Sequence, residues 1–292
     1  MCNSQESQYL SLITHILNHG SHEKGRNGNT ISSFGHMMRF NLRDGVLPLL
    51  TTKRVAWKTC FRELMWFIRG QTDNNVLNSQ NVHIWDANAS PEFLKTRELE
   101  YRNGLLGPIY GWQWRNFGGE YTHSEASKNG PGDQLAAIIR QLKDPAQRTS
   151  RRMVMSAWNP LQLDQMALPP CHVLAQFSVR EGRYLSCALY QRSGDMGLGV
   201  PFNIASYSFL TYLLAHHCGL EPDEFVHFLG DAHIYEEHVD ALKEQVLREP
   251  MEFPRIKISC DVRERIEDYN ETDIVFIEEY KHHPSINMKM VA

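Results

Sequence analysis

Residues 173–190 read VLAQFSVREGRYLSCALY, and this stretch decides the class of fold. Apolar residues recur at every second position in residues 173–179 and again in residues 184–190, and the polar segment between them contains Gly182. Such alternation, bounded by turn residues, is typical of strands with one buried face. We therefore predict two successive strands here.

The flanking segments extend this pattern on both sides. Residues 153–158 predict an earlier strand, and residues 205–217 form a long apolar stretch that predicts a helix ending before Gly219. The same reasoning predicts helices at 9–18, 61–68, 133–143 and 234–247, and strands at 37–42 and 256–260. Aromatic, turn-rich segments at 82–86 and 107–117 favour a binding surface over a core. No linker of biased composition divides the chain, so we expect one mixed α/β domain.

Composition and charge exclude several classes of protein. The formal net charge is -4 over 292 residues, with both signs interspersed, so we expect no nucleic-acid partner and no membrane partner. The first ten residues lack a secretory signal, and no stretch approaches the length of a membrane span. The six cysteines form no CxxC pair and no zinc-ligand spacing, which favours a reducing, cytoplasmic location and no bound metal.

One cysteine stands in an unusual context, in the motif Pro169-Pro170-Cys171-His172. Two prolines fix the backbone before Cys171, and rigid placement suits a nucleophile. A nearby arginine would favour the reactive thiolate. If the segment enters a strand, His172 points to the opposite face from the thiol and is not its base. On this motif alone, a packed core cysteine remains the commoner interpretation.

Two further clusters combine charge with hydrogen-bonding groups. The segment QRSGD at residues 191–195 follows a predicted strand, and glycines come soon after it, so it suits a ligand site or an ordinary polar turn about equally. Arg151 and Arg152 are adjacent; they suit either a solvated strand edge or bidentate contacts with a phosphate.

Asn203 and the segment DAHIY at residues 231–235 also have two interpretations. Asn203 precedes an apolar helix, where an amide commonly caps the first turn. Its side chain can instead accept from a ring N–H and donate to a carbonyl, the pattern that uracil presents. The segment at 231–235 suits a capped helix start, and it also offers His233 and Tyr235 as donors two residues apart.

Taken together, these segments resemble the thymidylate synthase family along nearly the whole chain. The resemblance rests on an ordered series of motifs: SFG at 33–35, TTK at 51–53, ELMWF at 63–67, IWD at 84–86, LGPIYG at 106–111, SRR at 150–152, SAWN at 156–159, ALPPCH at 167–172, QRSGD at 191–195, LGVPFNIASY at 198–207 and GDAHIY at 230–235. It implies an α+β fold in which one domain, residues 1–292, contains a large mixed sheet packed by helices. The sheet is expected to form a homodimer interface.

The resemblance also implies a reaction: reductive methylation of dUMP to dTMP, with 5,10-methylenetetrahydrofolate as carbon donor and reductant and dihydrofolate as a product. Cys171 is expected to attack C6 of the uracil, with Arg192 favouring the thiolate. Phosphate is expected to bind Arg26 and Arg192, together with Arg151 and Arg152 of the partner subunit.

The remaining implied site residues divide by role. Glu63 is expected to organise proton transfers, Tyr110 to lie near the C5 proton, and Asn203 to hydrogen-bond O4 and N3–H of the base. The other expected nucleotide contacts are His172, Gln191, Ser193, Gly194, Asp195, His233 and Tyr235. The expected folate contacts are Asp195, Trp85, Phe202 and Val291.

The chain departs from the family pattern at three places. The loop around Arg26 reads GRNGNT at residues 25–30 and is one residue shorter than usual, and the chain ends KMVA at 289–292 where KMAV is usual. Residues 118–132 are expected to form a surface insertion. Two alternatives stay open: a dUMP hydroxymethylase, which would also keep Asn203, and an RNA-binding regulator. An asparagine at this position argues against the related dCMP hydroxymethylases.

Overall fold

A mixed sheet forms the centre of the computed structural model, which describes residues 3–25, 27–122, 130 and 132–290. Within these residues the sheet has six strands in the order β1-β2-β6-β5-β4-β3. The strands are Ser21–Gly25 (β1), Gly28–Asn41 (β2), Val154–Ser156 (β3), His172–Arg180 (β4), Tyr184–Asp195 (β5) and Glu221–Tyr235 (β6). The β5–β6 pair is parallel, whereas the other neighbouring pairs of this sheet are antiparallel. The predicted α+β class with a large mixed sheet is confirmed.

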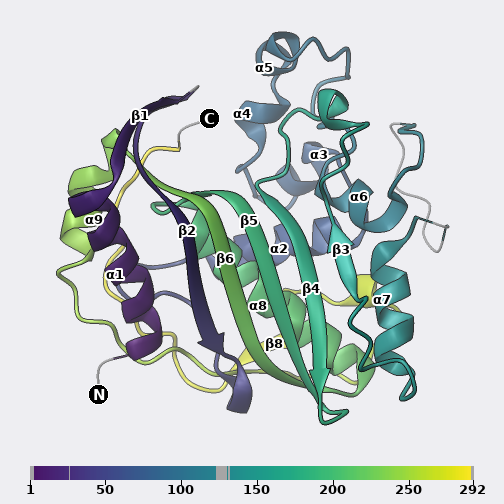
Figure 1. Cartoon of the computed structure of the whole chain (residues 1–292). Helices are drawn as coiled ribbons and strands as arrows, with labels where there is room; N and C mark the ends of the chain where they lie inside the picture. Colours follow the sequence, from purple (N-terminus) through teal and green to yellow (C-terminus); the bar gives the residue numbers. More distant parts are fainter. Residues whose placement is uncertain (1–2, 26, 123–129, 131, 291–292) are drawn as a thin grey trace.

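Helices cover the back of the sheet in the view of Figure 1 and leave its front bare. The crossover helix Gly199–Cys218 (α8) joins the parallel strands; it is apolar on all sides, as a helix buried between a sheet and other helices must be. Gly219 ends it with φ 66°, a left-handed conformation that glycine adopts without strain. The other helices are Ser4–His19 (α1), Trp57–Ile68 (α2), Asn74–Asn78 (α3), Asp86–Ala89 (α4), Pro91–Thr96 (α5), Tyr110–Asn116 (α6), Gln134–Lys143 (α7) and Val239–Gln245 (α9).

Local patterns predicted most of these elements. The strands at 173–179 and 184–190 are confirmed as β4 and β5, and β5 continues to Asp195 because its last residues pair with β6. The helices at 9–18, 61–68, 133–143 and 205–217 are confirmed, each with slightly longer or shifted bounds. The strand at 256–260 is present as Ile256–Ile258 (β7), paired with Ile274–Phe276 (β8). The strand at 153–158 is present as the shorter β3.

The prediction for residues 234–247 is wrong at its start, and strand β6 was missed. Residues 231–235 continue β6, a 3-10 turn follows at Glu236–His238, and α9 begins only at Val239. The polar residues Asp231 and His233 obscured the strand pattern. The segment is nevertheless a strand because β6 lies between β2 and β5, whose backbones satisfy its main-chain hydrogen bonds.

Two other predictions also need correction. Strand β2 starts at Gly28 rather than at 37, because antiparallel pairing with β1 and β6 extends it through Gly- and Asn-rich sequence. Residues 107–117 contribute to the core more than to a surface: α6 is largely buried, and Trp112 and Trp114 are each only 2% exposed. Arg115 ties α6 to its surroundings through buried ion pairs with Asp133 (2.8 Å) and Glu267.

No helix in the described part of the chain is long and apolar enough to cross a membrane. The predicted surface insertion at 118–132 falls largely outside the described residues, which lack 123–129 and 131.

Candidate active site

Strand register brings the predicted site residues to one edge of the sheet. His172, at the start of β4, pairs with Gln191, and near the end of β5 Asp195 pairs with His233 of β6. The start of β4 and the ends of β5 and β6 therefore meet there. A cavity of about 710 Å³ opens at this edge. Most predicted site residues line it: Glu63, Trp85, Tyr110, Cys171, His172, Gln191, Arg192, Ser193, Asp195, Phe202, Asn203, His233 and Tyr235.

Cys171 is held by its backbone on both sides. Its N–H donates to the Tyr110 hydroxyl over 2.8 Å, and its carbonyl accepts from the Arg192 N–H over 2.9 Å. The side chain remains partly exposed in the cavity wall. Rigid backbone with an accessible thiol is the arrangement that a cysteine nucleophile requires.

Arg192 places a fixed positive charge beside this cysteine. Its Nε donates to the Pro170 carbonyl over 2.8 Å and its Nη2 to the Pro169 carbonyl over 3.1 Å. The guanidinium carbon also lies 5.5 Å from the centre of the Trp158 ring. The carbonyls of the two prolines thus hold the guanidinium of Arg192 next to the segment that carries Cys171, where a positive charge would favour a thiolate or bind a phosphate.

His172 is an uncharged, buried ring. Its Nδ1 lies 2.8 Å from the Tyr207 hydroxyl, and it stacks on Tyr110 with 3.9 Å between ring centres. Burial, with a smaller contribution from His227, lowers the pKa of His172 to about 3. A neutral imidazole engaged in this way is a poor base for the thiol, in line with the sequence-based expectation.

Glu63 is the carboxyl group best suited to proton transfer. Its side chain borders the cavity on one side and is enclosed by other protein atoms on the rest. The indole Nε1 of Trp85 donates to its Oε1 over 2.7 Å. Burial raises the pKa of Glu63 to about 7, although the Trp85 hydrogen bond opposes the rise. A carboxyl group that titrates near neutral pH can both accept and donate a proton. Burial also raises the pKa of Tyr110 well above its usual value, so its hydroxyl stays neutral.

Asn203 faces the cavity from inside a helix. The helix-capping interpretation is wrong, because α8 begins at Gly199 and its N-cap position is Leu198. The tight turn after β5 starts the helix earlier than the sequence suggested: the Asp195 carboxylate accepts from the N–H groups of Gly197 (2.8 Å) and Leu198 (3.3 Å). Asn203 is thereby free to offer its amide to a ligand.

Hydrogen bonds between side chains orient other polar groups of the wall. The Gln191 Oε1 accepts from His227 Nε2–H over 2.8 Å, and the Gln191 Nε2–H donates to the Ser193 carbonyl over 2.9 Å. His233 Nδ1 lies 2.9 Å from Asp231 Oδ1. Burial acts to raise the pKa of Asp195, but His238 and the Gly197 N–H outweigh it, and the pKa is lowered.

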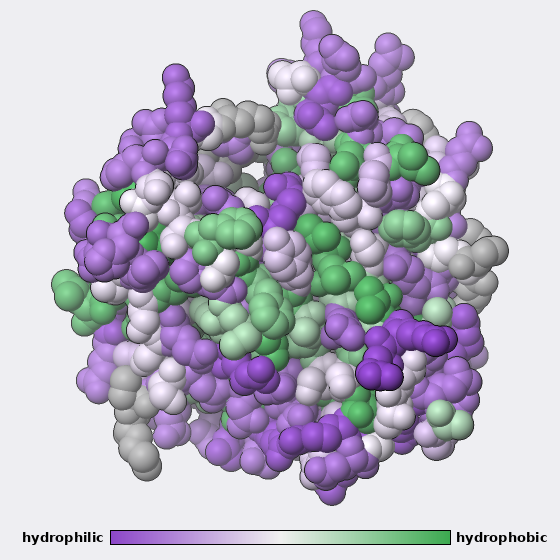
Figure 2. All heavy atoms as spheres, viewed as in Figure 1, coloured by the Kyte–Doolittle hydropathy of each residue, from purple (hydrophilic) through white to green (hydrophobic). Residues whose placement is uncertain are grey.

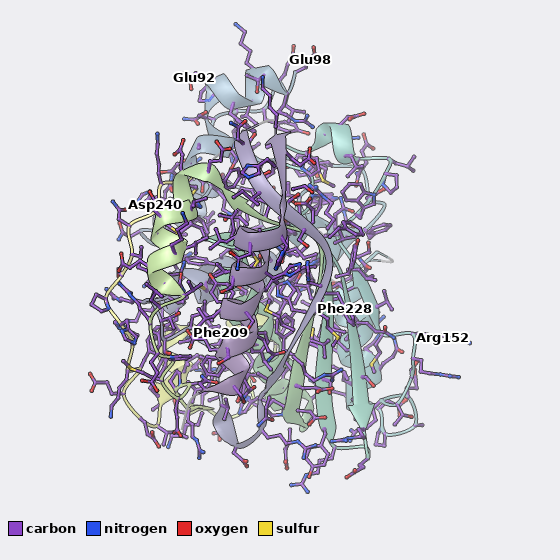
Figure 3. The ribbon with its side chains drawn as sticks, turned by 60° about the vertical axis from the view of Figure 1, so that its left-hand side comes forward. Glu92, Glu98, Arg152, Phe209, Phe228 and Asp240 are labelled. Carbon is purple, nitrogen blue, oxygen red and sulfur yellow. The ribbon has the colours of Figure 1, made fainter. Side chains whose placement is uncertain are left out.

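Five predicted residues are absent from the described cavity wall. Gly194 is buried in the sheet, where an added β-carbon would lie 2.9 Å from Leu229. Arg151 and Arg152 are exposed in the turn before β3, and Figure 3 shows Arg152 extending outward, clear of the rest of the chain. Arg26 and Val291 lie outside the described residues.

The cavity also contains residues that sequence reasoning missed. Asn88, Arg97 and Met290 line it. Asn88 follows the IWD motif closely enough to have been noticed, and Met290 directly precedes the predicted folate contact Val291, whereas no local signal marks Arg97. Among the described residues, no group of three or more His, Cys, Asp or Glu side chains could hold a metal ion.

A fixed cysteine beside an arginine, a carboxyl group that titrates near neutral pH and a free amide on one cavity define a class of enzyme that works through a thiol nucleophile. Comparison with known proteins specifies the class further: the family model described as thymidylate synthase matches residues 7–292. The chain belongs to the thymidylate synthase family.

Three individual relatives match this chain along more than nine tenths of their own length. The chain is 51% identical to the "Thymidylate synthase 1/2" of Encephalitozoon cuniculi, over 98% of this chain and 97% of the relative. It is 52% identical to the thymidylate synthase of Homo sapiens, over 98% of this chain and 91% of the relative. The thymidylate synthase of equine herpesvirus 2 is also 52% identical, over 98% of each chain.

Proposed function

We propose that this chain, as one catalytic domain over residues 1–292, converts dUMP to dTMP through covalent attack by Cys171. As a member of the thymidylate synthase family it is a methyltransferase that uses 5,10-methylenetetrahydrofolate as co-substrate. The observation that carries the mechanism is the position of Cys171, whose backbone bonds to Tyr110 and Arg192 hold its thiol at a cavity that also contains Glu63 and Asn203.

The residues divide the work between nucleophile, orientation and proton transfer. The Cys171 thiolate adds to C6 of the uracil, and the negative charge that results spreads over C5 and O4. Asn203 hydrogen-bonds O4 and N3–H, while Glu63, acting through water, supports the charge at O4 and exchanges protons. Arg192 holds the phosphate, and Ser193, His233 and Tyr235 orient the nucleotide and its 3'-hydroxyl.

The other end of the cavity fits a folate. The rings of Trp85 and Phe202 offer flat surfaces for a planar ring, and Ile84 and Leu198 add apolar contacts. The Asp195 carboxylate offers an acceptor for the N–H groups of such a ring. When bound there, methylenetetrahydrofolate supplies the one-carbon unit and the hydride that complete the methyl group. The protein contributes alignment and exclusion of water.

The proposed activity is tested by incubating the protein with dUMP and methylenetetrahydrofolate. We expect dihydrofolate, followed by absorbance, and dTMP, identified by mass, to form together in equal amounts. A hydroxymethylated nucleotide without dihydrofolate would move the assignment to a dUMP hydroxymethylase, and absence of any product would refute the enzyme proposal.

We further propose a homodimer formed through the bare face of the sheet, and a cytoplasmic location for it. Register aligns an apolar row across four strands: Leu174 pairs with Tyr190, and Phe228 pairs with both Tyr190 and Met37. Tyr190, Phe228 and Met37 are 42%, 40% and 52% exposed. Figure 2 shows hydrophobic residues gathered over the middle of this face within a hydrophilic rim. A patch of this kind favours a partner surface.

The five cysteines that the structure describes are free, which supports the proposed cytoplasmic location because the cytoplasm is a reducing compartment.

Dimer formation lets the exposed Arg151 and Arg152 serve the partner subunit's phosphate site. We expect the double variant Arg151→Ala, Arg152→Ala to lose most activity at low dUMP, because two charged contacts disappear. Mixed with an inactive Cys171→Ala variant and allowed to exchange subunits, it should recover roughly a quarter of wild-type activity, since half of the dimers are mixed and each has one intact site. The same mixture with exchange blocked by crosslinking is the control. Failure to recover activity despite demonstrated exchange would contradict donation across the interface.

A further inference from the structure

His238 connects the cavity to the C-terminal segment of the chain. It ends the 3-10 turn Glu236–His238 after β6, and its side chain is fully buried. Its Nε2 lies 2.7 Å from the Lys289 carbonyl oxygen, which can only accept, so Nε2 carries a proton. Its Nδ1 faces the Asp195 carboxylate at 3.7 Å, within ion-pair range. One imidazole thus links the end of β5 to the tail.

The tail is docked at three successive residues. Met288 packs against the core, Lys289 offers its carbonyl to His238, and Met290 lines the cavity. Gly197 makes this close approach possible: a β-carbon there would lie 2.6 Å from His238 Nδ1 and 3.1 Å from the Met288 sulfur. Among the described residues 284–290, the main chain otherwise accepts a hydrogen bond from Arg248 at the Pro284 carbonyl, so the His238 contact has a large share in the position of the tail.

We propose that His238 is a positioning residue that ties the C-terminal segment to Asp195 and so holds Met290 against the folate side of the cavity. The expected change in folate KM rests on the proposed function. The docking of the C-terminal segment on His238 does not depend on it. The nucleotide side of the cavity is built from Arg192, Ser193 and Asn203, which the tail contacts described here do not include. Loss of the link therefore weakens folate binding and leaves dUMP binding intact.

The link also depends on pH. The Asp195 carboxylate and the Lys289 carbonyl raise the pKa of His238, while burial and the nearby Lys53 oppose the rise. The other neighbouring groups are the Tyr235 ring, 5.7 Å away, and His233, which faces Asp195. A raised pKa in the docked state means that docking is fully supported below the ordinary histidine pKa and weakens as pH rises through the docked value. When the His238 ring is neutral with its proton on Nε2, Nδ1 presents a lone pair to the Asp195 carboxylate, and this contact no longer stabilises the docked tail.

Two substitutions separate the halves of the link. In His238→Asn, the amide occupies the Nδ1 position, keeps the group near Asp195 and cannot reach Lys289. In His238→Gln, the amide nitrogen takes the Nε2 position, keeps the bond to the Lys289 carbonyl and does not titrate. We expect His238→Asn to raise the folate KM roughly tenfold, the size of one hydrogen bond of a charged group, with an unchanged Kd for dUMP. His238→Gln should stay close to wild type and lose the rise of folate KM with increasing pH.

A second measurement does not depend on activity. Lys289 is exposed, so trypsin can cut after it when the tail leaves its docked position. Release of the terminal peptide, followed by mass, should be faster in His238→Asn than in wild type and His238→Gln, at equal Tm. If the protein makes no dTMP but cleavage follows this order, the tail link stands and the proposed function fails. Equal cleavage rates and equal folate KM in the wild type and both variants would overturn the link.

Discussion

Replacing Cys171 with alanine is expected to abolish dTMP formation, with kcat reduced by roughly 10⁴-fold or more, the usual consequence of removing a covalent nucleophile. Without the sulfur no bond forms at C6 of the uracil, and C5 does not become nucleophilic. The backbone contacts of residue 171 to Tyr110 and Arg192 do not involve the side chain, so the cavity should keep its shape. Calorimetry should then show dUMP binding that is retained or only modestly weakened.

Cys260 offers a matched control, because it is also a partly exposed free cysteine. It lies on the segment after β7, it is absent from the cavity wall described here, and its pKa is raised by burial and by Asp273. Cys260→Ala should keep activity near that of the wild type. If Cys171→Ala retained activity comparable to Cys260→Ala, covalent catalysis by Cys171 would be refuted.

Glu63→Gln is expected to lower kcat by roughly 10²–10⁴-fold, the range typical of losing a general acid–base group. Trp85 can still donate to the amide oxygen, so the local geometry should persist. Because the pKa of Glu63 is about 7, the pH–rate profile of the wild type should contain a break near that pH. The break should be absent in the variant, as measured by kcat between acidic and alkaline buffers.

The same substitution should stabilise the protein at alkaline pH. The folded-state pKa of Glu63 is raised above its unfolded value, so folding opposes ionisation and stability is lost as pH rises through the range between the two values. Removing the charge should increase the free energy of unfolding by about 1–3 kcal/mol at pH 8, with little change near pH 4. Denaturant titrations at both pH values provide the measurement. If the break near pH 7 in the pH–rate profile persisted in Glu63→Gln, that break would belong to another group.

The sequence predicted those parts of the fold that depend on short-range periodicity. Helix α2 follows from apolar residues at helical spacing, strands β4 and β5 from alternation, and the end of α8 from Gly219. Strand β6 was missed because its character is set by neighbours distant in sequence. Its backbone pairs with β2, some 200 residues earlier in the chain, and this pairing outweighs local propensity.

The features of the site likewise divide into those that the sequence predicted and those that only the structure revealed. Motif order in the sequence identified the residue types, and most of them line one cavity. Sequence alone left Asn203 between a helix cap and a base contact, and the early start of α8 decided against the cap. It also gave no signal for Arg97, which lies outside the quoted motifs and yet lines the cavity.

By itself, then, the sequence determined the class of fold and the family, and it predicted which groups are reactive, because each depends on residue types at fixed spacing. Only the tertiary structure decided their chemical state. The pKa of Glu63 rises to about 7 because burial excludes water from its carboxyl group, and Arg192 is fixed beside Cys171 because two proline carbonyls accept its N–H groups. The link from His238 to Lys289 likewise joins residues 51 positions apart. Burial and long-range contacts arise from packing of the whole chain, and no local pattern specifies them.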